Sequence, residues 1–304
     1  MNRVVLFTSQ DIGFQLAEFF ASREDLATLV VAQHTPRDRI YGYRSAIDVC
    51  RASRMPFIEA GRVTDDIRRQ TEEWRPDLIV SAYYPHIIPP SILGVPRLGC
   101  INIHPGILPD YRGRFPTPWY ILNGESHFGI AIHHLTNGVD TGDVLVQRKY
   151  PLNGETGHEL YRRTMHLGAE LLVEHFDRII AGDIQAAEQR AGGSYFRTIE
   201  RRYEIDWNLS RESISRRVRV HGEPYFPAYT FLFNKMILIS RTRSVEIEGY
   251  TPQGGGEIVK TWPDGRFAVS CNDGCLLIEE YTVCPPLRSE EERQLHISAG
   301  NRLG

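Results

Sequence analysis

Residues 3–34, "RVVLFTSQDIGFQLAEFFASREDLATLVVAQH", run from an apolar segment through an amphipathic stretch to a second apolar segment. The same alternation continues through "YRSAIDVCRASR" (43–54), "PDLIVSAYY" (76–84) and "GCINIH" (99–104). Continuous apolar strands that alternate with helices are typical of a parallel sheet covered on both faces. The first half of the chain is therefore predicted to be an α/β fold, with a mostly parallel twisted sheet and helices on both of its faces.

The pattern changes after residue 128. Two strands and a long helix are predicted, over "GIAIHHL" (129–135), "DVLVQRKYPL" (143–152) and residues 156–183. The two strands are joined by "TNGVDTG" (136–142), which indicates a hairpin or a wide loop. Thr156 and Glu159 have the spacing of a capping box at the start of the helix, and Gly182 marks its end.

The last third of the chain is predicted to be a separate small β domain. Short strands are expected in "YTFLF", "KMILISRTR", "GEIVKTW", "RFAVSC" and "CLLIEEYTV", after a basic helix in "SRESISRRVRV". Short strands with turn signals between them are typical of a β-barrel, here an OB-like barrel. The predicted domains are the α/β domain at 1–190, a polar linker at 191–205 and the barrel at 206–304.

Composition and local motifs exclude several classes of protein. The 304 residues carry a net charge of −3, so no global basic field attracts nucleic acid or membranes. The N-terminus has too short an apolar run for a signal peptide, and no later run approaches a membrane span, which predicts a cytoplasmic protein. The loop "TSQDIG" (8–13) lacks the glycines of an NAD site. Cys271 and Cys275 flank a hairpin turn and are interpreted as strand residues, so no metal site is expected.

Asn102 and His104 are candidate catalytic residues at the end of a predicted strand. Side chains at positions i and i+2 of a strand share a face, and the following Pro-Gly ends the strand. A neutral histidine there can accept a proton from a nucleophile, and an amide can donate a hydrogen bond to an oxyanion. Asp140 in the next loop is a candidate to hold the imidazole. His133 and His134 are adjacent and face opposite sides of their strand, which disfavours a shared metal site.

The segment "INIHPGILPDYRG" (101–113), with "GVDTGD" (138–143) after it, resembles the signature of formyltransferases that use N10-formyltetrahydrofolate. Further resemblance lies in "PDLIVSAYYPHIIPPSIL", "PRLGCINIH", "RGRFPTPWYILNGE" and "GEIVKTWPDGRFAVSC". The architecture that this resemblance implies is an α/β catalytic domain followed by an OB-like barrel, which agrees with the pattern above. Many relatives have Ser where this chain has Pro105 and Gly106, so any contact at Gly106 is expected through the backbone.

The resemblance also implies roles for particular residues. His104 would be the general acid and base, Asn102 would stabilise the tetrahedral intermediate, and Asp140 would orient the imidazole. The donor N10-formyltetrahydrofolate would be bound through its pterin ring by the backbone of His86, Ile87, Ile88, Thr136, Asn137, Gly138, Val139 and Asp140. Arg114 would line the active site and reach cofactor or substrate.

The family has one branch that formylates methionyl-tRNA and another that formylates an amino sugar attached to a nucleotide. The tRNA enzymes carry a basic loop after the second strand, whereas "QHTPRDRIYGYRSAIDVC" (33–50) is short and has few cations. The basic segments in 197–220 are interpreted as a solvated linker and helix face. A nucleotide-linked amino sugar is therefore the favoured substrate.

The stretch "SAYYPHII" (81–88) resembles most the module that acts on UDP-4-amino-4-deoxy-L-arabinose, which implies a place in lipopolysaccharide biosynthesis. We expect no dehydrogenase half beside it, so a different nucleotide sugar stays open as the substrate. The alternatives are methionyl-tRNA formyltransferase, a folate-consuming hydrolase and a non-catalytic binding protein with a vestigial catalytic domain. For the barrel, substrate binding, formation of a homodimer and structural support all stay open.

Overall fold

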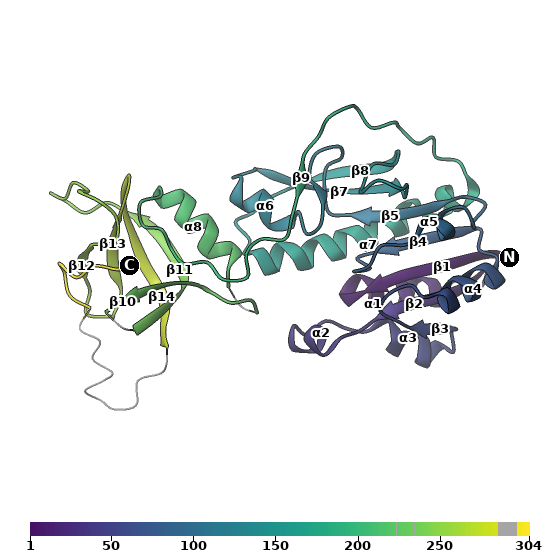
Figure 1. Cartoon of the computed structure of the whole chain (residues 1–304), viewed down its shortest axis with the longest axis horizontal. Coiled ribbons are helices and arrows are strands. Elements are labelled where there is room, and N and C mark those ends of the chain that lie inside the picture. Colours follow the sequence, from purple (N-terminus) through teal and green to yellow (C-terminus); the bar gives the residue numbers. More distant parts are fainter. Residues whose placement is uncertain (223, 234, 285–296) are drawn as a thin grey trace. The chain divides into compact units, whose positions relative to one another are not determined.

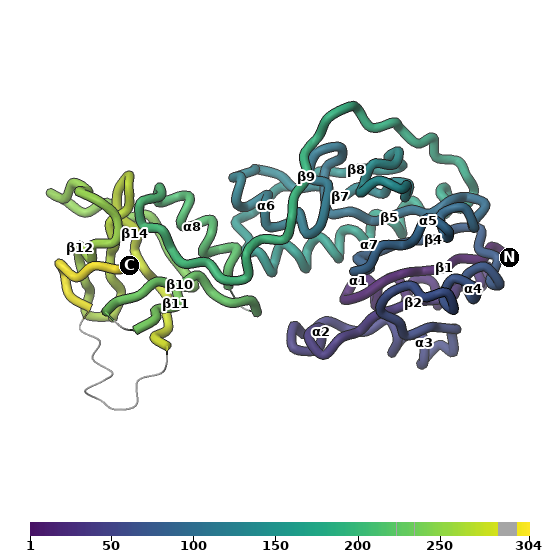
Figure 2. Tube along the Cα trace, in the orientation of Figure 1, coloured from purple at the N-terminus to yellow at the C-terminus, as the bar shows by residue number. Residues whose placement is uncertain are grey.

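The computed structural model describes residues 1–222, 224–233, 235–284 and 297–304 (Figures 1 and 2). The described residues divide into two compact units. The first unit consists of Met1–Thr117, Ser126–Leu152 and Tyr161–Thr198, and the second of Pro118–Glu125, Asn153–Leu160 and Ile199–Gly304. The boundary at Thr198 falls within the predicted linker, residues 191–205. The exact limits of the two domains remain a prediction.

A mostly parallel sheet forms the centre of the first unit. Its strands, in spatial order, are β3 (Phe57–Glu59), β2 (Leu26–Gln33), β1 (Asn2–Ser9), β4 (Leu78–Ala82), β5 (Cys100–His104), β7 (His127–His134) and β8 (Val144–Pro151). The strands from β3 to β5 are parallel to one another, whereas β7 is antiparallel to both β5 and β8. The prediction of a mostly parallel sheet is confirmed, and so is the pair of strands after residue 128.

Helices cover both faces of this sheet (Figure 1). One face packs against α1 (Gln10–Ala21), α3 (Ala46–Ser53) and α7 (Gly157–Ala181), and the other against α4 (Asp65–Trp74) and α5 (Pro90–Leu93). Alternate residues of β1 point to opposite faces of the sheet. Val4 and Leu6 pack in the core under α1, α3 and α7, and Val5 and Phe7 pack in the core under α4 and α5. Burial on both sides explains why these strands are apolar throughout.

Short elements complete the first unit and lead into the second. They are α2 (Pro36–Ile40), β6 (Arg112–Gly113), α6 (Thr117–Leu122) and β9 (Tyr195–Phe196). Strand β6 pairs in parallel with β9, although more than 80 residues separate them in the chain. This pairing brings the segment after α7 back to the loop that follows β5.

The main part of the second unit is a small antiparallel β domain with a ten-residue helix packed on it. Its strands, in spatial order, are β10 (Ala228–Leu232), β11 (Lys235–Val245), β14 (Gly274–Cys284), β13 (Phe267–Cys271) and β12 (Ile258–Thr261), and its helix is α8 (Arg211–Val220). Ile214 and Val218 of α8 are buried in the same core as Ile237 and Ile239 of β11. The predicted barrel-like C-terminal domain is confirmed. Among the described residues, no helix is long and apolar enough to span a bilayer.

Helix α7 begins with the predicted capping box. The Thr156 N–H donates to Glu159 Oε2 at 2.9 Å, and the Glu159 N–H donates to Thr156 Oγ1 at 3.3 Å. These two bonds satisfy N–H groups that have no partner within the helix. The helix ends directly before Gly182, as the sequence predicts.

Replacing Thr156 with Ala removes the oxygen that accepts from Glu159, so we expect the free energy of unfolding to fall by about 1 kcal/mol. Thr156→Ser keeps that oxygen and should retain most of the stability. Urea denaturation followed by circular dichroism measures both variants. Equal loss in the two variants would show that the cap contributes nothing.

Candidate active site

The two candidate residues of β5 lie at its carboxyl end and on one face. Asn102 is opposite His133 in the neighbouring antiparallel strand β7, and His104 is opposite Ala131. Ile101 and Ile103 point to the other face and join the core beneath α1 and α7. This alternation leaves Asn102 and the buried His104 side by side where the strand ends.

Asp140 lies in the loop between β7 and β8 and faces His104. Its Oδ2 is 3.6 Å from His104 Nδ1, and it accepts a hydrogen bond of 2.9 Å from the Gly113 N–H. The backbone of Asp140 has a φ of +52°, in the left-handed region that few non-glycine residues occupy. The sequence-predicted Asn102, His104 and Asp140 therefore lie together in the structure.

His133 is a member of this cluster that the sequence analysis missed. Its Nε2 is 3.4 Å from Asp140 Oδ1 and 3.3 Å from Asn102 Nδ2. Its Nδ1–H donates to the His134 carbonyl at 2.8 Å, which leaves Nε2 to accept from the Asn102 amide in the neutral form. No local sequence signal identifies His133, because its place depends on how β7 is aligned with β5.

The second ring nitrogen of His104 is held by the backbone. His104 Nε2 is 2.7 Å from the Tyr111 carbonyl, and a carbonyl oxygen only accepts, so Nε2 carries a proton in this arrangement. A methyl group added at Gly106 would overlap both the His104 ring and that carbonyl. Gly106 therefore makes the close approach possible. Proton transfer through Nε2 requires the Tyr111 carbonyl to move away.

Burial and charge oppose each other in this cluster. Burial lowers the pKa of His104, and His133 lowers it further, while the Asp140 carboxylate raises it by a smaller amount. Burial acts to raise the pKa of Asp140, but His104, His133 and the Gly113 N–H outweigh it and hold that pKa well below its usual range. At neutral pH the cluster thus contains an ionised Asp140 beside a neutral His104.

The predicted pterin-binding segments flank the cluster. His86–Ile88 follow β4, which lies beside β1 where the strand order reverses, a place where α/β sheets bind ligands. Within the described residues, the backbone N–H and C=O groups of Ile87 and Ile88 make no hydrogen bond. In the loop of Thr136–Val139, Val139 is exposed, and Thr136 Oγ1 is 2.8 Å from Thr141 Oγ1.

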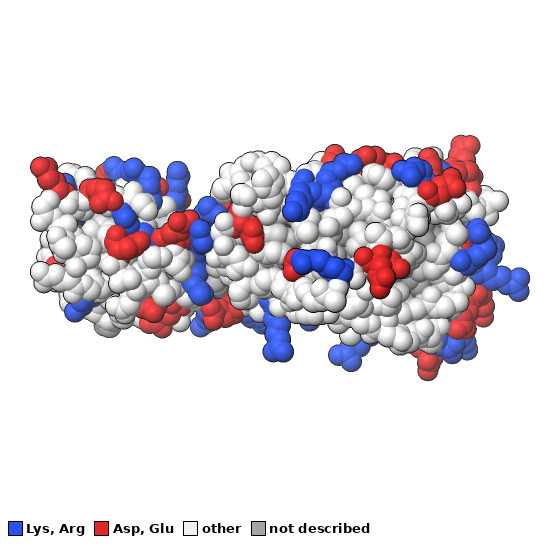
Figure 3. Space-filling model, turned by 90° about the horizontal axis from the view of Figure 1, so that it is seen from above, with Lys and Arg blue, Asp and Glu red and all other residues white. Residues whose placement is uncertain are grey.

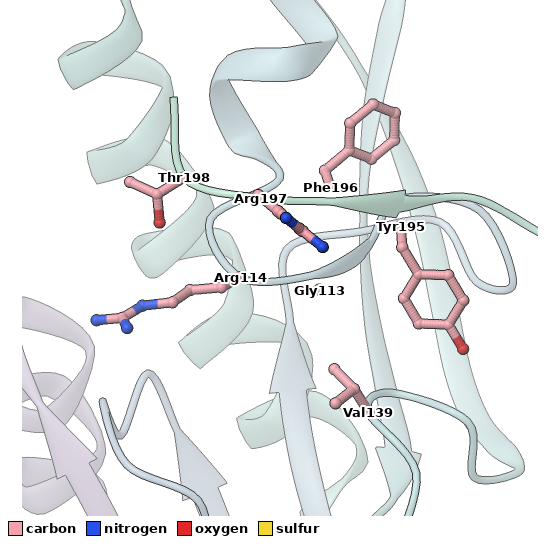
Figure 4. A pocket seen from close by; sticks show the side chains of 7 residues that line it. All are labelled: Gly113, Arg114, Val139, Tyr195, Phe196, Arg197 and Thr198. Atoms are coloured by element: carbon pink, nitrogen blue, oxygen red, sulfur yellow. The ribbon is translucent and has the colours of Figure 1, made fainter. Parts of the chain in front are cut away.

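Arg114 lies at a cavity of about 590 Å³ next to the cluster (Figure 4). The residues that line the cavity are Gly113, Arg114, Val139, Tyr195, Phe196, Arg197 and Thr198. Arg114 and Thr198 lie on one side of Gly113 in Figure 4, and Tyr195 and Val139 lie on the other. Two lining residues are next to Asp140: Val139 precedes it in the chain, and the Gly113 N–H donates to its carboxylate. The cavity therefore adjoins the Asp140 carboxylate.

Comparison with known families agrees with this arrangement. The model of the formyl transferase family matches residues 3–176, and that of the formyl transferase C-terminal domain matches residues 199–285. The chain belongs to the formyl transferase family.

Sequence relatives include methionyl-tRNA formyltransferases. The protein of Citrifermentans bemidjiense is 35% identical over 208 residues, which cover 67% of this chain and 64% of that protein. That of Geobacter sulfurreducens is 36% identical over 220 residues, covering 71% and 66%. These matches span slightly less than two thirds of either relative. The protein of Lachnospira eligens is 28% identical over 291 residues, covering 91% of both chains.

Solved structures with the same fold include sugar N-formyltransferases. WlaRD, a sugar 3N-formyl transferase in the presence of dTDP and 5-N-formyl-THF, has a TM-score of 0.70 at 18% identity and covers 94% of this chain and 99% of its own. The N-formyltransferase from Helicobacter canadensis, in complex with folinic acid and dTDP-3-aminofucose, has a TM-score of 0.69 at 18% identity, covering 93% and 100%.

We expect NMR titration of the ligand-free protein to give His104 a pKa below that of an ordinary histidine, because burial disfavours the imidazolium. Asp140→Asn should lower this pKa further, because it removes the negative charge that favours the imidazolium. A higher pKa in Asp140→Asn than in the wild type would contradict this account of the cluster.

Proposed function

We propose that this protein transfers the formyl group of N10-formyltetrahydrofolate to the amine of a nucleotide-linked amino sugar. The observation that carries the proposal is the cluster of Asn102, His104 and Asp140 at the end of β5, beside a cavity with two arginines. A buried histidine with a paired carboxylate and a neighbouring amide is suited to acyl transfer to an amine.

Each member of the cluster has a distinct role in this proposal. Once the Tyr111 carbonyl has moved away and the ring proton lies on Nδ1, toward Asp140, neutral His104 accepts at Nε2 the proton that the attacking amine releases. It then returns that proton to the leaving nitrogen. The Asn102 amide donates a hydrogen bond to the oxygen that gains negative charge. Asp140 stabilises the imidazolium that forms, as its position 3.6 Å from Nδ1 allows. His133 holds the Asn102 amide and shares the carboxylate.

The formyl donor fits the segments next to the cluster. N10-formyltetrahydrofolate would supply the formyl group, and its pterin ring presents donors and acceptors at its edge. The free backbone groups of Ile87 and Ile88 can match such an edge, and the backbone of residues 136–140 provides a second wall. The Ile87 side chain is 86% exposed and so does not fill the space itself.

The cavity beside Asp140 supports a nucleotide-linked substrate. Arg114 makes no ion pair with any described residue, so its guanidinium is available for a phosphate. Tyr195 is 57% exposed on the same cavity and offers a ring on which a base can stack. The residue proposed for the diphosphate is Arg114.

The charged surface gives less support to tRNA as the substrate. In the second unit, Arg216 is 2.6 Å from Glu212 and Arg217 is 3.4 Å from Glu200, so carboxylates already offset the basic stretch. In the loop after β2, Arg44 lies over the Phe14 ring at 4.0 Å. On the face shown in Figure 3, acidic and basic side chains are interspersed. A tRNA-binding surface would instead gather cations.

Methionyl-tRNA formyltransferase is the second candidate. The specific observation in its favour is the identity of 35% and 36% to enzymes with that name, against 18% for the sugar enzymes of similar fold. Both candidates use the same cluster and the same donor, so they differ only in the amine that is bound.

A competition assay is expected to separate the two candidates. The protein is supplied with N10-formyltetrahydrofolate, charged initiator tRNA, and a panel of UDP-, dTDP- and GDP-linked 3- and 4-amino sugars that includes UDP-4-amino-4-deoxy-L-arabinose. Mass spectrometry should detect one added formyl group on a sugar nucleotide. Formylation of the tRNA alone would replace the proposed substrate, and folate binding without any transfer would favour a binding protein.

His104→Ala is expected to lower kcat by about 10²- to 10⁴-fold, because proton transfer to the imidazole is lost. Asn102→Ala and Asp140→Ala should also reduce kcat, by smaller factors. His134→Ala is the matched control, because His134 follows His133 on the other side of β7. Wild-type turnover in His104→Ala would refute the mechanism but not the family.

A further inference from the structure

Arg112 is a buried cation in β6, the short strand that follows β5. Only 7% of the residue is exposed. Its Nε donates to the Asp140 carbonyl at 3.2 Å, its Nη1 to the Gly192 carbonyl at 3.1 Å, and its Nη2 to Gln189 Oε1 at 2.6 Å. Arg112 therefore joins the β7–β8 loop, which carries Asp140, to the segment that follows α7.

No carboxylate of the described residues forms an ion pair with Arg112. The charge is met by carbonyl and amide oxygens, by the Tyr195 hydroxyl, which accepts from Nη1 at 3.2 Å, and by the Tyr195 ring, whose centroid is 5.3 Å from the guanidinium carbon. A buried cation without an opposite charge is costly for stability. The planar guanidinium offers several donors in fixed directions, which a lysine cannot match.

Gln189 also contacts the β7–β8 loop. Its Oε1 accepts from Arg112, and its Nε2 donates to the carbonyls of Asp140 at 2.9 Å and of Gly142 at 2.6 Å. The Asp140 carbonyl thus accepts from both Arg112 and Gln189. Bonds to its main chain from two directions hold this residue in its left-handed conformation.

The pairing of β6 with β9 sets the position of these donors. Arg112 is opposite Tyr195 and Gly113 is opposite Phe196 in this pairing, and the Arg112 N–H donates to the Ser194 carbonyl at 3.0 Å. Gly113 has a φ of +101°, and any side chain there would overlap the Phe196 backbone. The Gly113 N–H is thereby free to donate to the Asp140 carboxylate.

We propose that Arg112 and Gln189 are positioning residues, which hold the backbone of Asp140 so that its carboxylate faces His104 and His133. Their effect on turnover rests on the proposed function, whereas their effect on the geometry does not. The titratable groups that face the His104 ring are Asp140 from the β7–β8 loop and His133 from β7. Release of Asp140 weakens the interaction that favours the imidazolium.

Gln189→Met tests the proposal because it keeps the length and charge of the side chain and removes its amide. Arg190→Met is the matched control. Arg190 is the next residue, and its exposed guanidinium joins the segment after α7 to the loop that follows β5, through Asp110 Oδ2 at 2.6 Å, without a hydrogen bond to the described residues of the β7–β8 loop. The readouts are the His104 pKa from NMR titration of the ligand-free protein, and kcat and KM for formyl transfer.

In Gln189→Met, the His104 pKa is expected to fall toward the value in Asp140→Asn. We expect kcat to fall by about 10- to 100-fold, the range typical of residues that orient a catalytic group, with both KM values unchanged. Arg190→Met should match the wild type in all three quantities. A wild-type His104 pKa in Gln189→Met would overturn the proposal, even if no formyl transfer is found for any variant.

Gln189→Glu separates the two roles of the side chain and serves if Gln189→Met does not fold. A glutamate still accepts from Arg112, but it cannot donate to the Asp140 and Gly142 carbonyls. The proposal predicts a lower kcat in this variant, whereas wild-type kcat would show that Gln189 only satisfies Arg112. Turnover is the readout here, because the added negative charge itself raises the pKa of His104.

Discussion

The Asp140 carboxylate is the buried charge on which the arrangement of the active site depends. A buried carboxylate needs cations or hydrogen-bond donors around it. Here the Gly113 N–H donates to it, and the rings of His104 and His133 lie within 3.6 Å of it. Each comes from a different element, so satisfying one charge brings together β5, β7 and the loop after β5. Asp140 makes these contacts with a left-handed backbone.

The α/β sheet supplies the rigid part of this arrangement, and the loops supply the adjustable part. Strand β5 lies between the parallel strand β4 and the antiparallel strand β7, and it presents Asn102 and His104 at its carboxyl end. The loops approach so closely that glycine is required at Gly106 and Gly113. Preorganised hydrogen-bond groups on a rigid scaffold are what acyl transfer needs, because little reorganisation is then left for the reaction.

The sequence relatives and the structures of similar fold are named for different amines. The sequence relatives are named for methionyl-tRNA, while the structures of similar fold include sugar enzymes with dTDP ligands. Neither comparison identifies the amine that this chain formylates. The proposal of a nucleotide-linked substrate rests on the cavity at Arg114 in the first unit and, separately, on the paired cations of α8 in the second.

The sequence by itself determined the order of strands and helices, because apolar periodicity and capping are local properties. It also determined that Asn102 and His104 share a face, since that follows from strand geometry. Only the tertiary structure revealed His133, Arg112 and Gln189 as neighbours of Asp140. Their places depend on the register of β5 with β7 and of β6 with β9, which long-range packing decides and no local pattern encodes.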